Sequence, residues 1–150
     1  VEAVIVLPLF VILFVGIFAT MIPALDWLEL NAGKLGTPTP GFFYWGSGVL
    51  SSVLDNAPTY LSFLSALMGT THDGDMQQVL ANHYHSLVAI SVGSVFFGAN
   101  TYIGNGPNFL VKSIADQQKV NTPTFVGYVL KYTLPFMLPM LLIVWLIFFR

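Results

Sequence analysis

The chain contains no cysteine, so disulfide bonds and thiolate metal sites are excluded. Charge is also scarce, because only 8% of the 150 residues are charged and 55% are hydrophobic, whereas soluble domains carry roughly 25% charged residues. Five Lys and Arg residues stand against seven Asp and Glu residues, which provides no basic surface for nucleic acid. The scarcity of charge predicts an integral membrane protein.

Two long segments are apolar enough to cross a bilayer as helices. Residues 3–25 carry no charge over 23 positions, and residues 124–149 carry a single Lys, while a bilayer core needs about 20 helical residues. We expect the first to be a scaffold helix and the last to bend at Pro135 and Pro139. The Pro, Gly and Thr residues of segment 26–40 predict a polar connection.

The first segment does not have the features of a signal peptide. It is too long for a signal-peptide core, no basic region precedes it, and residue 1 is Val rather than Met. We therefore expect the chain to be a piece of a larger membrane protein, namely its C-terminal part.

A carboxylate interrupts the next apolar run. Residues 41–69 carry Asp55 as their only formal charge, and Asn56 and Pro58 follow it closely. A charged side chain at the centre of a membrane helix costs about 2.5 to 3.5 kcal/mol on insertion scales. Asp55 is therefore expected to be buried against partners or to line a wet cavity, which indicates a transport site. The alternative is that Asp55 or Asn56 only caps a helix with Pro in its first turn.

The apolar pieces on either side of this break are short. Residues 41–54 and 58–69 would form helices of about 21 Å and 18 Å at 1.5 Å per residue, and neither crosses a core of about 30 Å. They form either one broken helix that crosses once or a re-entrant hairpin that turns at Asp55 and Asn56. Irregular backbone at membrane depth is tolerated only where it is buried in protein or faces water.

Loop charges favour the hairpin. Segment 112–123 holds two Lys residues, segment 70–83 holds none, and segment 26–40 holds one Lys against two acids. The positive-inside rule places 112–123 in the cytoplasm and the other two segments outside. Those two can share one side only if the run between them crosses an even number of times, as a hairpin does.

A second break interrupts the apolar pattern of residues 84–118. Segment 98–108 contains three Gly, three Asn and one Pro residue, which is more than an ordinary membrane helix tolerates. Amide, hydroxyl and freed carbonyl oxygens at such a break suit a hard cation. The alternative is a kinked helix packed closely on a neighbour through its small residues.

Histidines suggest a rival of a different class, an intramembrane metal enzyme that would use His72, His83, His85 and an Asp. His83 and His85 are two positions apart, which points them to different faces of a helix. No His-x-x-x-His pattern is present in the sequence. Segment 70–83 is more simply interpreted as a solvated polar loop, and we expect neither a metal site nor an enzyme.

At its two breaks, segments 52–59 and 98–108, the sequence resembles the ion transporter superfamily, which includes citrate and dicarboxylate carriers, arsenite permeases and sodium/proton antiporters. The resemblance implies an all-α membrane fold that forms the C-terminal half of an inverted-repeat transporter. The implied elements are a helix at 3–25, a re-entrant hairpin at 41–69, an interrupted helix at 84–118 and a helix at 124–149.

The hairpin tip departs from one branch of that superfamily. Carboxylate carriers typically show Ser-Asn-Thr there, whereas this chain has Asp55, Asn56, Ala57, Pro58 and Thr59. A fixed carboxylate repels an anion and attracts a cation or carries a proton, so the sodium/proton antiporters are the nearest branch. The expected function is secondary active Na+/H+ antiport. A proton- or sodium-coupled carrier of citrate, dicarboxylate or arsenite is the alternative.

The candidate ion-binding residues follow from these two breaks. They are Asp55, Asn56, Thr59, Ser51, Ser52, Asn100, Thr101, Asn105 and Asn108, with Pro58, Gly104, Gly106 and Pro107 shaping the backbone. The two glycines are expected to allow close backbone approach.

No cofactor is expected beyond the transported Na+ and H+. The expected partners are the lipid bilayer, a small cation or carboxylate and the N-terminal half of the same transporter, with a homodimer left open and no nucleic acid. The expected location is the bacterial cytoplasmic membrane.

Overall fold

The computed structural model describes residues 2–35, 38–71 and 75–150, and every regular element within these ranges is a helix. The predicted all-α class is therefore confirmed. One continuous helical stretch of the described residues, Phe125–Phe148, is long and apolar enough to cross a membrane by length and composition. The span predicted at 3–25 and the re-entry of the hairpin into a bilayer stay predictions.

The first helix is longer than the sequence suggested. Helix α1 (Glu2–Ala32) contains Pro8 and Pro23 and runs through the first part of the predicted connection 26–40. No Gly or Pro lies between Pro23 and Gly33, so the helix has no reason to stop earlier. A 3₁₀ turn, η1 (Gly33–Leu35), follows it.

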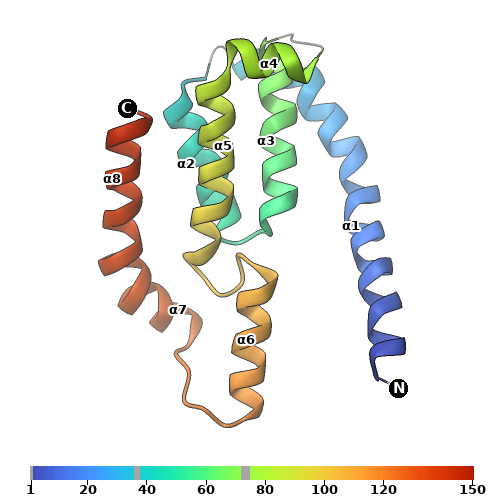
Figure 1. Cartoon of the computed structure of the whole chain (residues 1–150), viewed down its shortest axis with the longest axis vertical. Coiled ribbons are helices and arrows are strands. Elements are labelled where there is room, and N and C mark those ends of the chain that lie inside the picture. The colour runs from blue at the N-terminus through green and yellow to red at the C-terminus, as the bar shows by residue number, and fades with distance from the viewer. Residues whose placement is uncertain (1, 36–37, 72–74) are drawn as a thin grey trace.

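Two antiparallel helices form the predicted hairpin. Helix α2 (Pro40–Ser51) begins with Pro at its first position, and the Oγ1 of its N-cap Thr39 accepts a hydrogen bond from the Phe42 N–H. Helix α3 (Asn56–Thr71) returns after a short turn, and Figure 1 shows the tip of this hairpin near the middle of the molecule. Residues 41–69 thus fold as a pair of helices joined by a short turn, and the re-entrant character of this hairpin stays a prediction.

Segment 70–83 was predicted to be a polar loop, and this is wrong for its second half. Helix α4 (Met76–Asn82) occupies it, and the carboxylate of the N-cap Asp75 accepts a hydrogen bond from the Gln77 N–H at 3.3 Å. A capping Asp followed by Met, Gln and Leu residues suffices to start a short helix. His72 and its neighbour Asp73 lie outside the described residues.

The predicted interrupted helix is present. Helix α5 (Tyr84–Phe96) passes into a 3₁₀ turn, η2 (Phe97–Ala99), and the chain then runs without helical structure until α6 (Gly106–Gln117) begins. Helix α5 packs against both α2 and α3, and α6 extends beyond the hairpin tip (Figure 1). Residues 100–105 are thus a true break, which we call the α5–α6 break.

The final helix differs in detail from the predicted bent helix at 124–149. It consists of α7 (Phe125–Tyr128), a π-helical stretch η3 (Val129–Met137) and α8 (Leu138–Phe148). Pro135 lies inside η3 and lacks an N–H group, so α-helical bonding cannot continue through it. The Leu138 N–H bonds instead to the carbonyl of Thr133, five residues back.

The core lies between α2, α5 and the C-terminal helix. Tyr44 of α2 is fully buried, and its hydroxyl donates to the Leu141 carbonyl oxygen of α8 at 3.0 Å. A Cβ on Gly93 of α5 would lie 2.5 Å from the Tyr44 carbonyl oxygen, so glycine lets the two backbones touch. This close packing fixes the hairpin against α5 and so positions its tip.

The two ends of the molecule carry different connections. In Figure 1 the start of α2 and helix α4 lie at one end, and the connection between α6 and α7 lies at the other. The placement of these connections on opposite sides of a membrane stays a prediction. Which side faces the cytoplasm stays a prediction.

Candidate ion-binding site

The tip of the α2–α3 hairpin packs directly on the end of α5. Ser51, the last residue of α2, is fully buried, and its hydroxyl donates to the Ser94 carbonyl oxygen at 2.5 Å. The hydroxyl of Ser52 lies 3.3 Å from the Phe97 carbonyl oxygen. The Ser51 hydroxyl thus joins the hairpin to α5. The Ser52 hydroxyl, which also lies 3.1 Å from the Gly48 carbonyl oxygen of its own helix, lies against the η2 turn that follows α5.

Asn56 joins three segments at once. With its amide nitrogen facing the surrounding acceptors, it donates to the Ser94 carbonyl at 2.9 Å, to Ser51 Oγ at 2.9 Å and towards the Gly104 carbonyl at 3.3 Å. This orientation is the one that the neighbouring groups satisfy. Asn56 was predicted to supply an oxygen to an ion, whereas its amide nitrogen braces the start of α3 against the α5–α6 break.

Thr101 closes the loop inside the break. Its Oγ1 donates to the Ser52 carbonyl oxygen at 2.5 Å and accepts hydrogen bonds from the Gly104 N–H at 3.0 Å and the Ile103 N–H at 3.2 Å. The Asn100 amide nitrogen donates to Ser52 Oγ at 3.1 Å. The two breaks are therefore in direct contact, and hydroxyl and amide groups form this contact.

Glycine is needed at two points where the backbones meet. A Cβ on Gly104 would lie 2.6 Å from the Ser51 carbonyl oxygen and 2.9 Å from that of Ser52. A Cβ on Gly98, which the sequence did not single out, would lie 2.4 Å from the Asn56 amide. Gly106 has nothing within 4 Å of its Cβ position, so the close approach predicted there is not observed.

Two buried oxygens at this junction make no hydrogen bond within the described residues. They are Ser94 Oγ and Asn100 Oδ1. A buried oxygen left without a donor costs about 1 to 3 kcal/mol, so such groups need an explanation, and an ion is one. Asn100 was predicted as a ligand, but Ser94 was missed because it lies inside a segment that the sequence marks only as apolar.

Asp55 lies in the turn of the hairpin and is exposed. Its Oδ1 accepts a hydrogen bond from the N–H of the adjacent Asn56 at 2.9 Å, whereas a capping side chain accepts from the N–H two or three residues on, so the bond of the capping alternative is not observed. Its Oδ2 makes no hydrogen bond within residues 38–71 and 75–150. The sequence predicts that Asp55 is either buried against partners or lines a wet cavity, and burial within this chain is not observed. One of its carboxylate oxygens remains available to a ligand.

The remaining predicted residues lie outside this hydrogen-bond network. The hydroxyl of Thr59 turns back to the Asp55 carbonyl at 3.0 Å. Asn105 occupies the N-cap position of α6 without a capping side-chain bond. Asn108 lines a separate pocket of about 410 Å³ with Lys112 and Tyr102. Pro58 and Pro107 lie in the first turns of α3 and α6, where a missing N–H does no harm.

The histidines do not support the rival metal site. No group of three or more metal-binding side chains occurs among the residues that the structure describes. His85 is exposed and lines an apolar groove rather than the polar junction. His72 cannot be placed, since it lies outside the described residues.

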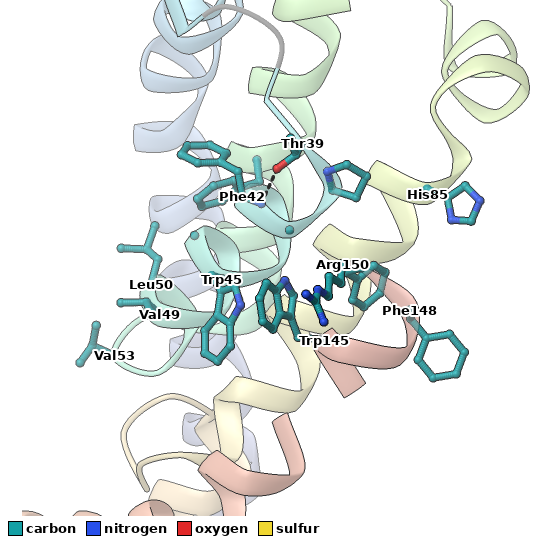
Figure 2. A pocket seen from close by; sticks show the side chains of 15 residues that line it. Thr39, Phe42, Trp45, Val49, Leu50, Val53, His85, Trp145, Phe148 and Arg150 are labelled. Carbon is teal, nitrogen blue, oxygen red and sulfur yellow. Dashed lines mark hydrogen bonds between the residues drawn. The ribbon is translucent and has the colours of Figure 1, made fainter. Parts of the chain in front are cut away.

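A large apolar hollow lies away from this junction. Figure 2 shows an apolar groove of about 1260 Å³ between α2 and the end of α8, where Trp45 and Trp145 face each other with ring centroids 6.1 Å apart. None of the residues that line it belongs to the polar junction. The groove is suited to apolar groups, and it provides no site for an ion.

Comparison with known proteins adds one match. The family model described as "Putative citrate transport" matches residues 7–149. No curated protein and no solved structure matches the chain. The matched range contains the hairpin, the α5–α6 break and the last helix, and so includes every residue of the polar junction.

Proposed function

The chain belongs to the citrate transporter-like family of ion transporters, and on this premise we propose that the hairpin tip and the α5–α6 break form the cation site of a secondary transporter. A member of a transport family is a membrane protein, and the two breaks then have a direct use. Transporters commonly build their sites from interrupted helices whose ends present oxygens to the ion.

The observation that carries the proposal is the set of oxygens at the junction. The carboxylate of Asp55 supplies the only formal charge, while Asn100 Oδ1 and Ser94 Oγ are buried and lack donors. Neither Lys nor Arg is present in segments 41–69 and 98–108. Oxygen donors with one negative charge and no cation nearby match a hard cation such as Na+ and do not match an anion.

The proposed reaction is exchange of Na+ for H+. Asp55 binds one or the other, because protonation removes the charge that attracts Na+. Sodium binding therefore expels the proton, and reprotonation from the other side of the membrane expels sodium. The bonds that Asn100 and Thr101 donate to Ser52, and that Asn56 donates towards Gly104, keep the hairpin tip and the break together, so both move as one unit when the site changes access.

A coupled carrier of citrate or a related carboxylate is the second candidate. The description of the matching family favours it. On this alternative the cation bound at the junction would attract the anion and drive its uptake. The anion itself would need donors from a region other than this cluster, such as the N-terminal half of the transporter.

The setting of the protein is part of the proposal. We place it in a bacterial cytoplasmic membrane, with segment 112–123 in the cytoplasm, because the Lys residues of that segment exceed those of the other connections. The site is complete only with the N-terminal half of the transporter. A homodimer is compatible with this arrangement.

The test uses the full-length protein in everted vesicles with a pH-sensitive dye, to which Na+, Li+ or K+ is added. We expect a Na+-dependent pH change that Asp55→Asn abolishes. The matched control is Asp75→Asn, since Asp75 also accepts a backbone N–H at a helix start and Asn caps as well as Asp. Uptake of labelled citrate without a response to any cation would move the function to the carboxylate carriers, and Na+/H+ exchange retained in Asp55→Asn would contradict the assignment.

A further inference from the structure

We infer that Thr133 and Tyr128 of the last helix are positioning residues for the ion site, an inference that rests on the proposed function. The Thr133 hydroxyl donates to the Asn100 carbonyl oxygen at 2.5 Å, across 33 residues of sequence. The Tyr128 hydroxyl donates to the adjacent carbonyl, that of Ala99, at 3.3 Å. Two successive carbonyls, the last of η2 and the first of the break, are thus held by one helix that supplies no oxygen to the proposed site.

These bonds fix Asn100, one of the two junction residues whose side chains have a buried oxygen without a hydrogen bond in the described chain. The Asn100 N–H bonds to the Phe97 carbonyl at 2.9 Å, and its amide nitrogen donates to Ser52 Oγ at 3.1 Å. The Asn100 carbonyl oxygen accepts a hydrogen bond from the Thr133 hydroxyl. Every other polar group of Asn100 is therefore held, and Oδ1 alone remains for an ion. Thr133 would act through Asn100 without touching the ion.

The π-helical stretch explains how both side chains reach the break. Residues five apart on an α-helix are rotated by about 140°, at 100° per residue, and would face different neighbours. The i→i+5 bonding of a π-helix brings such residues onto one face, and Tyr128 and Thr133 flank or belong to η3 (Val129–Met137). Pro135 enforces this bonding, because it cannot donate the α-helical hydrogen bond.

The burial of these contacts distinguishes them from surface bonds. Thr133 is the only residue of η3 that is buried, among nine that are described. The Tyr128 ring also packs on that of Tyr102 within the break, with centroids 6.1 Å apart. The last helix therefore holds two adjacent backbone carbonyls next to the proposed ion site. A movement of this helix would shift Asn100 Oδ1.

The first experiment measures the Na+ dependence of exchange by full-length Thr133→Val and Thr133→Ser. Val keeps the shape and removes the hydroxyl, whereas Ser keeps the hydroxyl. We expect Val to raise the KM for Na+ by about 3- to 10-fold with little change in maximal rate, the size expected for one hydrogen bond, and Ser to restore it. The control is Thr71→Val, whose hydroxyl bonds only within α3.

The second experiment needs no transport activity. Because the chain has no cysteine, a single Ile103→Cys in the exposed part of the break provides a clean labelling site, once any cysteines elsewhere in the full-length protein are replaced. We expect maleimide labelling to be several-fold faster when Thr133→Val is added and to return to the original rate with Thr133→Ser. Unchanged labelling and KM in Thr133→Val, or changes that Ser does not reverse, would overturn the inference.

The two experiments separate the two claims. Wild-type protein without Na+-dependent activity would count against the proposed function, and the labelling rates would still decide whether Thr133 positions the break. Normal wild-type exchange with an unaffected Thr133→Val variant would count against the positioning role alone.

Discussion

The two halves of the interrupted helix differ in how much of their surface the chain buries. Helix α5 packs on α2 and α3 and buries five residues, Gly93 and Ser94 among them. Helix α6 buries none of its described residues, and its Leu110 and Val111 are 57% and 67% exposed. One half is therefore fixed to the hairpin, while the other presents apolar side chains to lipid or to a neighbouring segment.

This difference explains why similar side chains have different roles. Asn56 and Asn100 lie on the packed side of the break, where their amides bond to carbonyl and hydroxyl oxygens. Asn108 lies on the open side, where it lines a separate pocket and has no part in the hydrogen-bond network of the described junction residues. The comparison shows that the role of each polar residue depends on how the surrounding chain packs against it. Residue type alone does not identify which of them bind the ion.

The largest effect on folding is expected at Gly104 of the break, with Gly106 at the start of α6 as its matched control. Gly104→Ala would place a Cβ 2.6 Å from a backbone oxygen that cannot move aside, so we expect destabilisation of about 3 kcal/mol or more. Gly106→Ala has open space and should change stability by less than about 0.5 kcal/mol. Thermal unfolding of the full-length protein in detergent measures the stability change of each variant. Equal losses of stability in the two variants would contradict the difference between the packed and the open side of the break.

The next effect is expected at the asparagines. Asn56→Ala leaves the Ser94 and Gly104 carbonyl oxygens without their shared donor, and we expect a loss of about 2 to 4 kcal/mol. The matched variant is Asn108→Ala on the open side, with an expected change within about 0.5 kcal/mol. If Asn108→Ala melted as early as Asn56→Ala, the packed and open halves would not differ as described.

The smallest effect on stability is expected at Ser94. Its hydroxyl makes no hydrogen bond within the described chain, so Ser94→Ala should leave stability within about 0.5 kcal/mol. It should nevertheless weaken Na+ binding by about 3- to 10-fold, because it removes a proposed ligand. Ser47→Ala sharpens the comparison, since the Ser47 hydroxyl donates to the Phe43 carbonyl at 2.7 Å. It should cost about 1 kcal/mol without changing Na+ affinity, and the reverse pattern would contradict the assignment of Ser94.

The sequence predicts where the chain breaks because Pro, Gly, Asn and Asp act locally. The hairpin turn and the α5–α6 break were found in this way. Ser94 and Thr133 were not, because a single hydroxyl in an apolar helix gives no local signal, and its partner lies across the fold. Helix α4 and the extension of α1 were missed because a polar composition suggested loops where nothing stops a helix.

The type of helical hydrogen bonding around Pro135 was also not predictable from the sequence. A proline predicts an interruption of helical bonding, and the interruption was expected as a bend. The structure has a π-helical stretch instead. Whether a helix bends or becomes π-helical at a proline depends on the neighbouring contacts. Here Thr133, within the π-helical stretch, bonds to the break.

Equilibrium binding of ²²Na+ to the full-length protein over a range of pH tests the central claim most directly. If Asp55 is the group for which Na+ and H+ compete, the wild-type affinity for Na+ falls as the pH is lowered. Asp55→Asn then binds Na+ weakly and with no dependence on pH over the same range. Binding that keeps its wild-type strength and pH dependence in Asp55→Asn would contradict the claim and place the site of competition on another residue.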